Sequence, residues 1–136
     1  MNIIGIDPGV NTGWARINSS GVLMACDSRP IHEAMREVES WHKHGRLRLV
    51  VFEDARLRKW LGPDKGPKQL QGAGSIKRDC RIWADLLAAL GCPTLAVKPQ
   101  KGGTKWDAER FAKLTGWKGR TNEHGRDAAL LVWGRK

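Results

Sequence analysis

The stretch that most constrains the fold is the opening one, where an apolar run ends on a carboxylate, turns, and returns as a second strand-like run. Asn2–Asp7 is apolar enough for a buried central strand, and Thr12–Asn18 alternates as a second strand should. This pattern fixes Asp7 at the mouth of a central strand, where a metal ion can reach it. A plain hairpin explains the same residues equally well, because Asp-Pro-Gly favours a turn on its own.

The rest of the sequence predicts a single domain over residues 1–136, of α/β class, with a five-stranded mixed sheet flanked by helices. Periodicity, caps and turn residues set the predicted elements. The further strands are Gly21–Asp27, Leu47–Glu53 and Thr94–Lys98, and the helices are Pro30 to Gly45, Gly72–Leu90, Asp107–Thr115 and Asn122–Trp133, the last capped by Asn122 or Thr121. Two basic segments rich in glycine, Ala55–Lys68 and Pro99–Lys105, are expected to be loops.

Charge is divided unevenly along the chain. Residues 1–55 hold six Lys and Arg against seven Asp and Glu, a net charge of −1, whereas residues 56–136 hold 18 against 7, a net charge of +11. A neutral part followed by a strongly basic part is typical of a protein that binds a polyanion, and nucleic acid is the polyanion we expect.

Composition excludes several classes. There is no apolar run of membrane-spanning length, and the chain starts directly in a strand, so we expect neither a membrane span nor a signal peptide. Cys26, Cys80 and Cys92 are odd in number and lack C-x-x-C spacing. They are therefore expected to be reduced core thiols of a cytoplasmic protein, not a disulfide framework or a zinc site.

Three further groups accompany Asp7. Glu53 ends the fourth predicted strand, and His124 and Asp127 stand at i and i+3 in the first turn of the last helix, so they share one face. If the first and fourth strands are neighbours and the last helix crosses their ends, all four converge. Each alone has an ordinary explanation, such as a solvated strand end or a favourable helix-dipole contact. Together, an oxygen-rich set with one imidazole suits Mg²⁺ or Mn²⁺.

The residues just described resemble a known family. Ile3–Ala15, Val51–Glu53, the Gly72–Gly91 helix and the closing run His124–Leu130 are similar to those of RuvC-type Holliday-junction resolvases, of the RNase H-like superfamily. The resemblance covers nearly the whole chain, and the order and spacing of the acids make it specific. The chain is shorter than typical bacterial members and closer in length to compact phage versions.

This resemblance implies an RNase H-like fold and a homodimer that nicks two symmetric strands of a four-way DNA junction. It assigns the metal and catalytic residues as Asp7, Glu53, His124 and Asp127. It implies Mg²⁺, with Mn²⁺ as a substitute, as two ions per active site that activate water and stabilise the leaving oxygen. The expected setting is the cytoplasm of a bacterial host or phage-infected cell, with no membrane and no small-molecule cofactor. The Gly72–Leu90 helix is the predicted dimer contact, because Ile82, Leu86 and Leu90 lie toward a different side from the stripe that faces the sheet. The alternative is that these three residues pack under the neighbouring helix.

DNA contacts are predicted in the basic segments. The candidates are Arg56, Arg58, Lys59, Trp60, Lys65, Lys68, Lys98, Lys101 and Lys105. Bacterial family members carry an aromatic wedge just after the central Glu, whereas Asp54–Leu57 has no aromatic residue here; Trp60 either replaces it by stacking on a base or packs on the domain. Four tryptophans fall on apolar faces and are predicted to be core residues: Trp14, Trp41, Trp83 and Trp133. For Trp106 and Trp117, which flank the second basic segment, both a core role and a DNA-stacking role stay open.

Three other functions use the same features. A non-catalytic nucleic-acid-binding module explains the basic half but not the joint presence of the acids. A phosphate-binding kinase of the actin/hexokinase type also opens on an Asp-x-Gly hairpin, but that class needs two such domains, which 136 residues cannot supply. An RNase H-like nuclease that acts on flaps, forks or RNA-containing substrates is the strongest rival, because the same metal site serves any phosphodiester.

Overall fold

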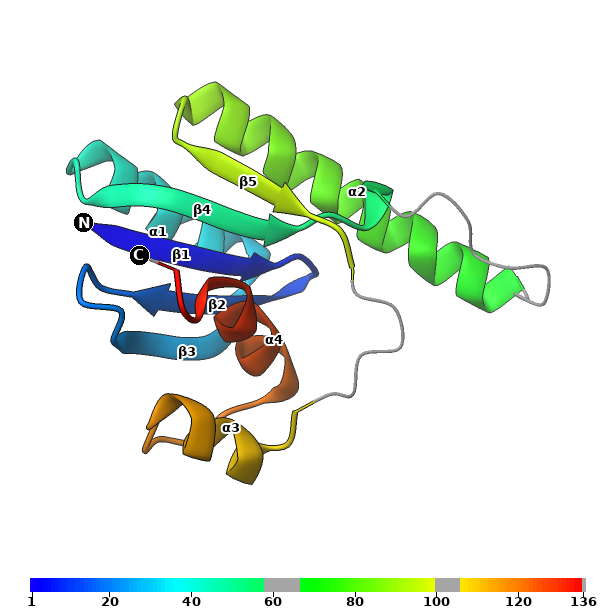
Figure 1. Ribbon diagram of the computed structural model, residues 1–136. Coiled ribbons are helices and arrows are strands. Elements are labelled where there is room, and N and C mark those ends of the chain that lie inside the picture. The colour runs from blue at the N-terminus through cyan, green and yellow to red at the C-terminus, as the bar shows by residue number, and fades with distance from the viewer. Residues whose placement is uncertain (58–66, 100–105, 136) are drawn as a thin grey trace.

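The structure is a computed structural model that describes residues 1–57, 67–99 and 106–135. A five-stranded mixed sheet forms its centre, in the order β3-β2-β1-β4-β5 (Figure 1). Its strands are β1 (Asn2–Asp7), β2 (Asn11–Ile17), β3 (Leu23–Pro30), β4 (Leu47–Glu53) and β5 (Thr94–Val97). The first three strands form an antiparallel meander, and β4 and β5 then extend the sheet in parallel to β1. The predicted fold class and the number of strands are confirmed.

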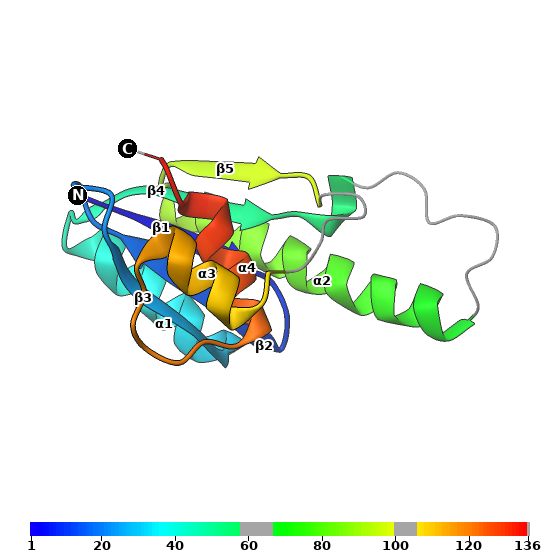
Figure 2. The same cartoon turned by 60° about the horizontal axis from the view of Figure 1, so that its bottom comes forward.

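Helices cover both faces of this sheet (Figure 2). They are α1 (Ile31–Lys43), α2 (Pro67–Leu90), α3 (Ala108–Thr115) and α4 (Glu123–Val132), and a short 3₁₀ turn, η1 (Ala55–Leu57), follows β4. The side chains of α1 and α2 pack on one face around Trp14, Phe52 and Trp83. Those of α3 and α4 pack on the other face. No helix in the described ranges is long and apolar enough to cross a membrane.

Successive side chains along a strand point to opposite faces of the sheet, which decides the face on which each residue of the central strands lies. Ile4 and Ile6 point to the α1–α2 side, whereas Ile3 points to the α4 side and is buried there. Asp7 follows in the same alternation, and so does Glu53, which comes two residues after Val51 on the α4 side. Both acids therefore lie at the ends of their strands on the face that α4 covers.

The close contact of β1 and β2 with α4 depends on two glycines, which have no side chain. A Cβ on Gly5 would meet the carbonyl oxygen of Ala128, and a Cβ on Gly13 would meet that of His124 and lie 2.8 Å from Cβ of Asp7. Any other residue at these positions would push α4 off the sheet. Gly13 thus sets the distance between the first turn of α4 and the end of β1.

The long helix α2 begins at Pro67, five residues before its predicted start, so part of the predicted basic loop is helical. Proline is favoured in the first turn of a helix, and the glycine-rich stretch after it is tolerated. Figures 1 and 2 show that the first half of α2 extends beyond the sheet. Ile76, in this first half of the helix, is 46% exposed.

Other predicted core residues are confirmed. Trp14 and Trp83 are fully buried, while Trp41 and Trp133 are half-buried against the two core clusters. Cys26, Cys80 and Cys92 are buried and carry free thiols. Leu86 and Leu90, predicted to lie on a separate side of α2, pack against the α1–α2 core instead, and Ile82 alone of the three is exposed.

Candidate active site

The first and fourth strands are parallel neighbours, as the predicted site requires. Their register pairs Ile6 with Phe52, so Asp7 and Glu53 are the next residues along two adjacent strands. Because the carboxyl ends of parallel strands meet at one edge of a sheet, both carboxylates emerge at that edge. The 3₁₀ turn η1 then leads the chain away from the site.

The last helix brings His124 to the same place. Nδ1 of His124 lies 3.4 Å from Oδ2 of Asp7, and the imidazole is 54% exposed while the Asp7 side chain is only 18% exposed. Gly125, Ala128, Ala129 and Val132 form the buried face of α4 against the sheet. His124 therefore sits at the rim of this contact, between the sheet edge and solvent.

The pKa of Asp7 reflects its burial and the charges around it. Burial is the largest cause that raises the pKa of Asp7, and the negative charges of Glu53 and Asp127 raise it further. Contact with His124 acts in the opposite direction, and the resulting pKa is about 6 against an ordinary value of 3.8. The other three predicted residues, Glu53, His124 and Asp127, thus all affect the pKa of Asp7. As their side chains stand, however, no three His, Cys, Asp or Glu residues of the described ranges form a closed metal-binding group.

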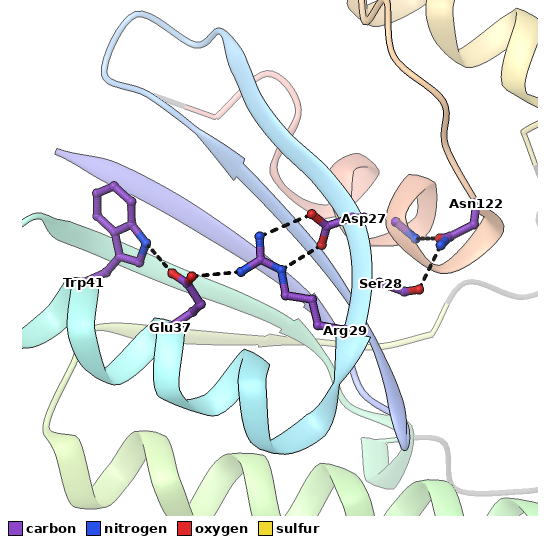
Figure 3. A network of polar contacts seen from close by, with 7 residues as sticks. Asp27, Ser28, Arg29, Glu37, Trp41 and Asn122 are labelled. Carbon is purple, nitrogen blue, oxygen red and sulfur yellow. Dashed lines mark hydrogen bonds and ion pairs between the residues drawn. The ribbon is translucent and has the colours of Figure 1, made fainter.

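The start of α4 is fixed by Asn122, one of the two predicted caps. Its side-chain oxygen accepts a hydrogen bond from the backbone N–H of Gly125 at 2.8 Å, as an N-cap should. Its amide nitrogen donates to Oγ of Ser28 at 2.8 Å, which ties the first turn of α4 to β3 (Figure 3). One residue therefore both caps the helix that carries His124 and Asp127 and attaches it to the sheet.

The chain after Glu53 is held by two residues that the sequence did not single out. The thiol of Cys80 donates to the carbonyl oxygen of Glu53 at 3.6 Å and accepts from the N–H of Ala55 at 3.4 Å. Asp54 is almost fully buried and accepts from Nε and Nη2 of Arg56, the latter at 2.8 Å. Burial acts to raise the pKa of Asp54, but these hydrogen bonds hold it below its ordinary value.

The predicted DNA-contacting residues are only partly described. The guanidinium of Arg56 forms an ion pair with Asp54, so only part of it is available to bind DNA. Lys98 is exposed just after β5. Lys68 falls in the first turn of α2, but its side chain lies outside the described part, as do Arg58, Lys59, Trp60, Lys65, Lys101 and Lys105.

Comparison with known proteins gives similarity of structure and not of sequence. No protein-family model and no curated protein matches this sequence. Thermus thermophilus RuvC in complex with a Holliday junction substrate matches with a TM-score of 0.57 at 16% identity, covering 98% of this chain and 90% of that one. The chain has the RuvC fold. A second RuvC structure from Thermus thermophilus gives a TM-score of 0.52 at 17% identity, covering 98% of this chain and 92% of RuvC.

Proposed function

We propose that this chain is a metal-dependent endonuclease that resolves four-way DNA junctions by symmetric phosphodiester hydrolysis. The observation that carries the proposal is the contact of His124 with the largely shielded carboxylate of Asp7, whose pKa is raised by burial and then by the charges of Glu53 and Asp127. The RuvC fold supports it, because a RuvC of that fold is solved on a Holliday junction.

The residues present fit a divalent cation. Burial, and then repulsion by the carboxylates of Glu53 and Asp127, raise the pKa of Asp7, and a cation among these groups would relieve that repulsion. Oxygen ligands with one imidazole suit Mg²⁺ or Mn²⁺. Asp7, Glu53, His124 and Asp127 would hold the metal. When bound, a pair of such ions supplies an activated water and stabilises the leaving oxygen of an in-line displacement.

Each residue has its own part in this proposal. Asp7 lies at the end of β1, largely shielded from solvent, and would be a ligand to the metal. Glu53 lies at the end of the neighbouring parallel strand β4, and its backbone carbonyl accepts a hydrogen bond from the thiol of Cys80 on α2. His124 lies in the capped first turn of α4, whose N–H groups and dipole favour negative charge such as a phosphate, and Asp127 follows three residues further along the helix.

The proposed substrate is branched DNA. A net charge of +11 over residues 56–136 supplies attraction to phosphates, and the exposed Lys98 lies just beyond β5, next to the strand that ends in Glu53. The predicted contacts of Arg56, Arg58, Lys59, Trp60, Lys65, Lys68, Lys101 and Lys105 belong to the same proposal. Because Arg56 already binds Asp54, we expect it to contribute less to DNA affinity than the lysines.

We further propose a homodimer, because paired nicks in a four-way junction need two active sites related by a two-fold axis. Exposed apolar residues on α2, Ile76 and Ile82, are the candidate contacts. Three buried free thiols fit a reducing compartment, so we place the protein in the cytoplasm of a bacterial or phage-infected cell.

The test is a comparison of substrates at equal length. Labelled four-way junction, fork, flap, linear duplex and RNA:DNA hybrid are incubated with the protein and Mg²⁺, and the products are separated on a denaturing gel. We expect paired nicks in the junction and little cleavage of linear duplex. Preferential cleavage of a fork, a flap or a hybrid would replace the junction with that substrate, and binding without any cleavage would leave a non-catalytic module.

A further inference from the structure

Trp106 and Arg110 form a stacked pair at the start of α3. The guanidinium carbon of Arg110 lies 4.1 Å from the centroid of the Trp106 ring. Arg110 is exposed, whereas Trp106 is half-buried. Asp107, the N-cap of α3, accepts from the backbone N–H of Arg110 at 2.7 Å, so the backbone between the two members of the pair is also fixed.

This pair is attached to the helix that carries the candidate active site. Nε of Arg126 donates to the carbonyl oxygen of Trp106 at 2.9 Å, and Nη1 of Arg126 donates to Oγ1 of Thr121 at 2.9 Å. Arg126 is the residue directly before Asp127 on α4. Figure 1 shows α3 beside α4, on the β3 side of the sheet. The position of Trp106 is therefore coupled to the first turn of α4.

The body of α3 is fixed as well. Phe111, the residue after Arg110, is fully buried in the core on the α4 side. Gly116 ends the helix in the left-handed conformation that glycine adopts most easily, and its N–H returns to the carbonyl oxygen of Ala112. An exposed arginine thus stands on a helix that the neighbouring Phe111 anchors in the core.

Within the described residues, two other arginines stack on tryptophan, but their polar atoms are used inside the protein. Arg29 lies over Trp14 and binds both Asp27 and Glu37 (Figure 3). Arg16 lies over Trp41 and donates to the side chain of Asn2. Arg110 differs from both, because in the described ranges no carboxylate lies within ion-pair distance of its guanidinium. Its N–H groups remain available to a ligand from outside.

We propose that Arg110 binds a backbone phosphate of the DNA and that Trp106 and Arg126 are the positioning residues that aim it. The proposal rests on the proposed function and names one substrate contact for it. The guanidinium already covers one face of the Trp106 ring, so its free N–H edge is the part that faces a ligand. A planar guanidinium matches the two oxygens of a phosphate, and stacking holds that plane in place. The DNA strand bound by Arg110 would then lie at a fixed position relative to Asp7, because Arg126 connects Trp106 to α4.

The test measures affinity for a fluorescent four-way junction over a range of salt concentrations, in EDTA so that no cleavage occurs. We expect R110A to weaken binding about tenfold at moderate salt, as loss of one charged hydrogen-bonded contact does. The slope of log affinity against log salt should fall by roughly 0.9, the value for one phosphate contact. R110K should keep the slope and lose part of the affinity, because a lysine keeps the charge without the planar geometry.

W106L tests the positioning role, with thermal unfolding measured in parallel. We expect W106L to lose affinity as R110A does, and the double variant W106L/R110A to lose little more, because both changes disable one contact. The matched control is K113A, which removes an exposed cation three residues further along α3 that pairs with Glu109 at 3.6 Å. Its affinity and slope should stay near those of the unaltered protein.

Several results would overturn the inference. One is an unchanged slope of log affinity against log salt for a folded R110A protein. Another is a loss of affinity in the double variant that equals the sum of the two single losses. A third is tighter binding by R110A, which would indicate that the freed Trp106 ring stacks on a base instead. Failure of the proposed function looks different. An unaltered chain that binds no DNA overturns both proposals, whereas normal cleavage together with unaltered R110A binding overturns this one alone.

Discussion

His124 lies in contact with Asp7 across 117 positions of sequence, with Nδ1 of its imidazole 3.4 Å from Oδ2 of the carboxylate. The contact joins the first strand to the last helix, and two glycines make it possible, Gly5 and Gly13, over which α4 packs. It also places a buried acid next to two others, Glu53 and Asp127, with consequences for stability and for metal binding.

The first prediction concerns stability and pH. The pKa of Asp7 is about 6 in the folded chain and near 3.8 when unfolded, so the folded state binds its proton more tightly. Ionised Asp7 therefore opposes folding, fully above pH 6 and less as the pH falls toward 4. In EDTA at pH 8, D7N should raise the free energy of unfolding by up to roughly 3 kcal/mol. Urea unfolding at pH 8 and pH 4 measures this, and the gain should vanish at pH 4.

The control for that measurement is D27N. Asp27 binds Arg29 at 2.9 Å, so the amide at that position should lower stability at pH 8 and not raise it. Added Mg²⁺ or Mn²⁺ should then stabilise the unaltered chain at pH 8 and leave D7N unaffected, because metal that binds only the folded state adds to its stability. A D7N variant less stable than the unaltered chain at pH 8 would contradict the assigned environment of Asp7.

The second prediction concerns the identity of the metal. An imidazole ligand favours Mn²⁺ over Mg²⁺ relative to a carboxylate. H124D should therefore retain cleavage and shift its preference toward Mg²⁺. Rates of junction cleavage with each metal in turn measure the shift. A folded H124D protein that is inactive with both metals would argue against His124 as a ligand.

The third prediction concerns the approach of α4 to the sheet. G13A places a methyl group against the carbonyl of His124 and Cβ of Asp7, both close to the backbone, so the helix must move. We expect a loss of about 1–3 kcal/mol in stability, as overpacking causes, and a drop in cleavage larger than the unfolded fraction explains. Chemical unfolding and cleavage rates are compared with those of G74A.

Gly74 is the matched position, because a Cβ there meets no atom within 4 Å. It lies inside α2, where alanine is favoured over glycine by up to about 1 kcal/mol. G74A should therefore be neutral or stabilising and should cleave normally. Equal behaviour of G13A and G74A would show that Gly13 does not set the site.

The sequence predicted those parts of the site that local pattern determines. An apolar run that ends on an acid indicates a strand end, and this placed Asp7 and Glu53 correctly on β1 and β4. The spacing of His124 and Asp127 followed from helix geometry in the same way. Whether the four residues converge depended on strand order, which no local pattern fixes.

Contacts between distant segments were missed for the same reason. Neither the hydrogen bonds of Cys80 to the chain around Glu53 nor that of Arg126 to Trp106 leaves a periodic signal. The early start of α2 was missed because Gly66-Pro67 is equally typical of a loop and of a first helical turn. Leu86 and Leu90 were placed on the wrong side of α2 because helical spacing does not say which faces a neighbouring helix will cover.

The fourth prediction concerns the homodimer. Ile82 is 44% exposed on α2, where it and the exposed Ile76 present apolar side chains that a second copy of the chain can cover. I82E should convert a dimer to a monomer without unfolding the chain, because no core contact is lost. Light scattering at micromolar concentration, with and without junction, measures the mass. The control is R81A on the neighbouring exposed position, and a monomeric unaltered protein that still makes paired nicks would exclude the two-fold arrangement.

The central claim is that Asp7 supports metal-dependent cutting of a junction that other residues bind. The most direct measurement follows a four-way junction labelled on each strand in turn, with the unaltered protein and D7N side by side, in Mg²⁺ and in EDTA. The account predicts paired nicks at symmetric positions for the unaltered protein in Mg²⁺ only, and no nicks for D7N, which should still bind the junction with similar affinity. Nicking by D7N at the unaltered rate, or by the unaltered protein in EDTA, would contradict it.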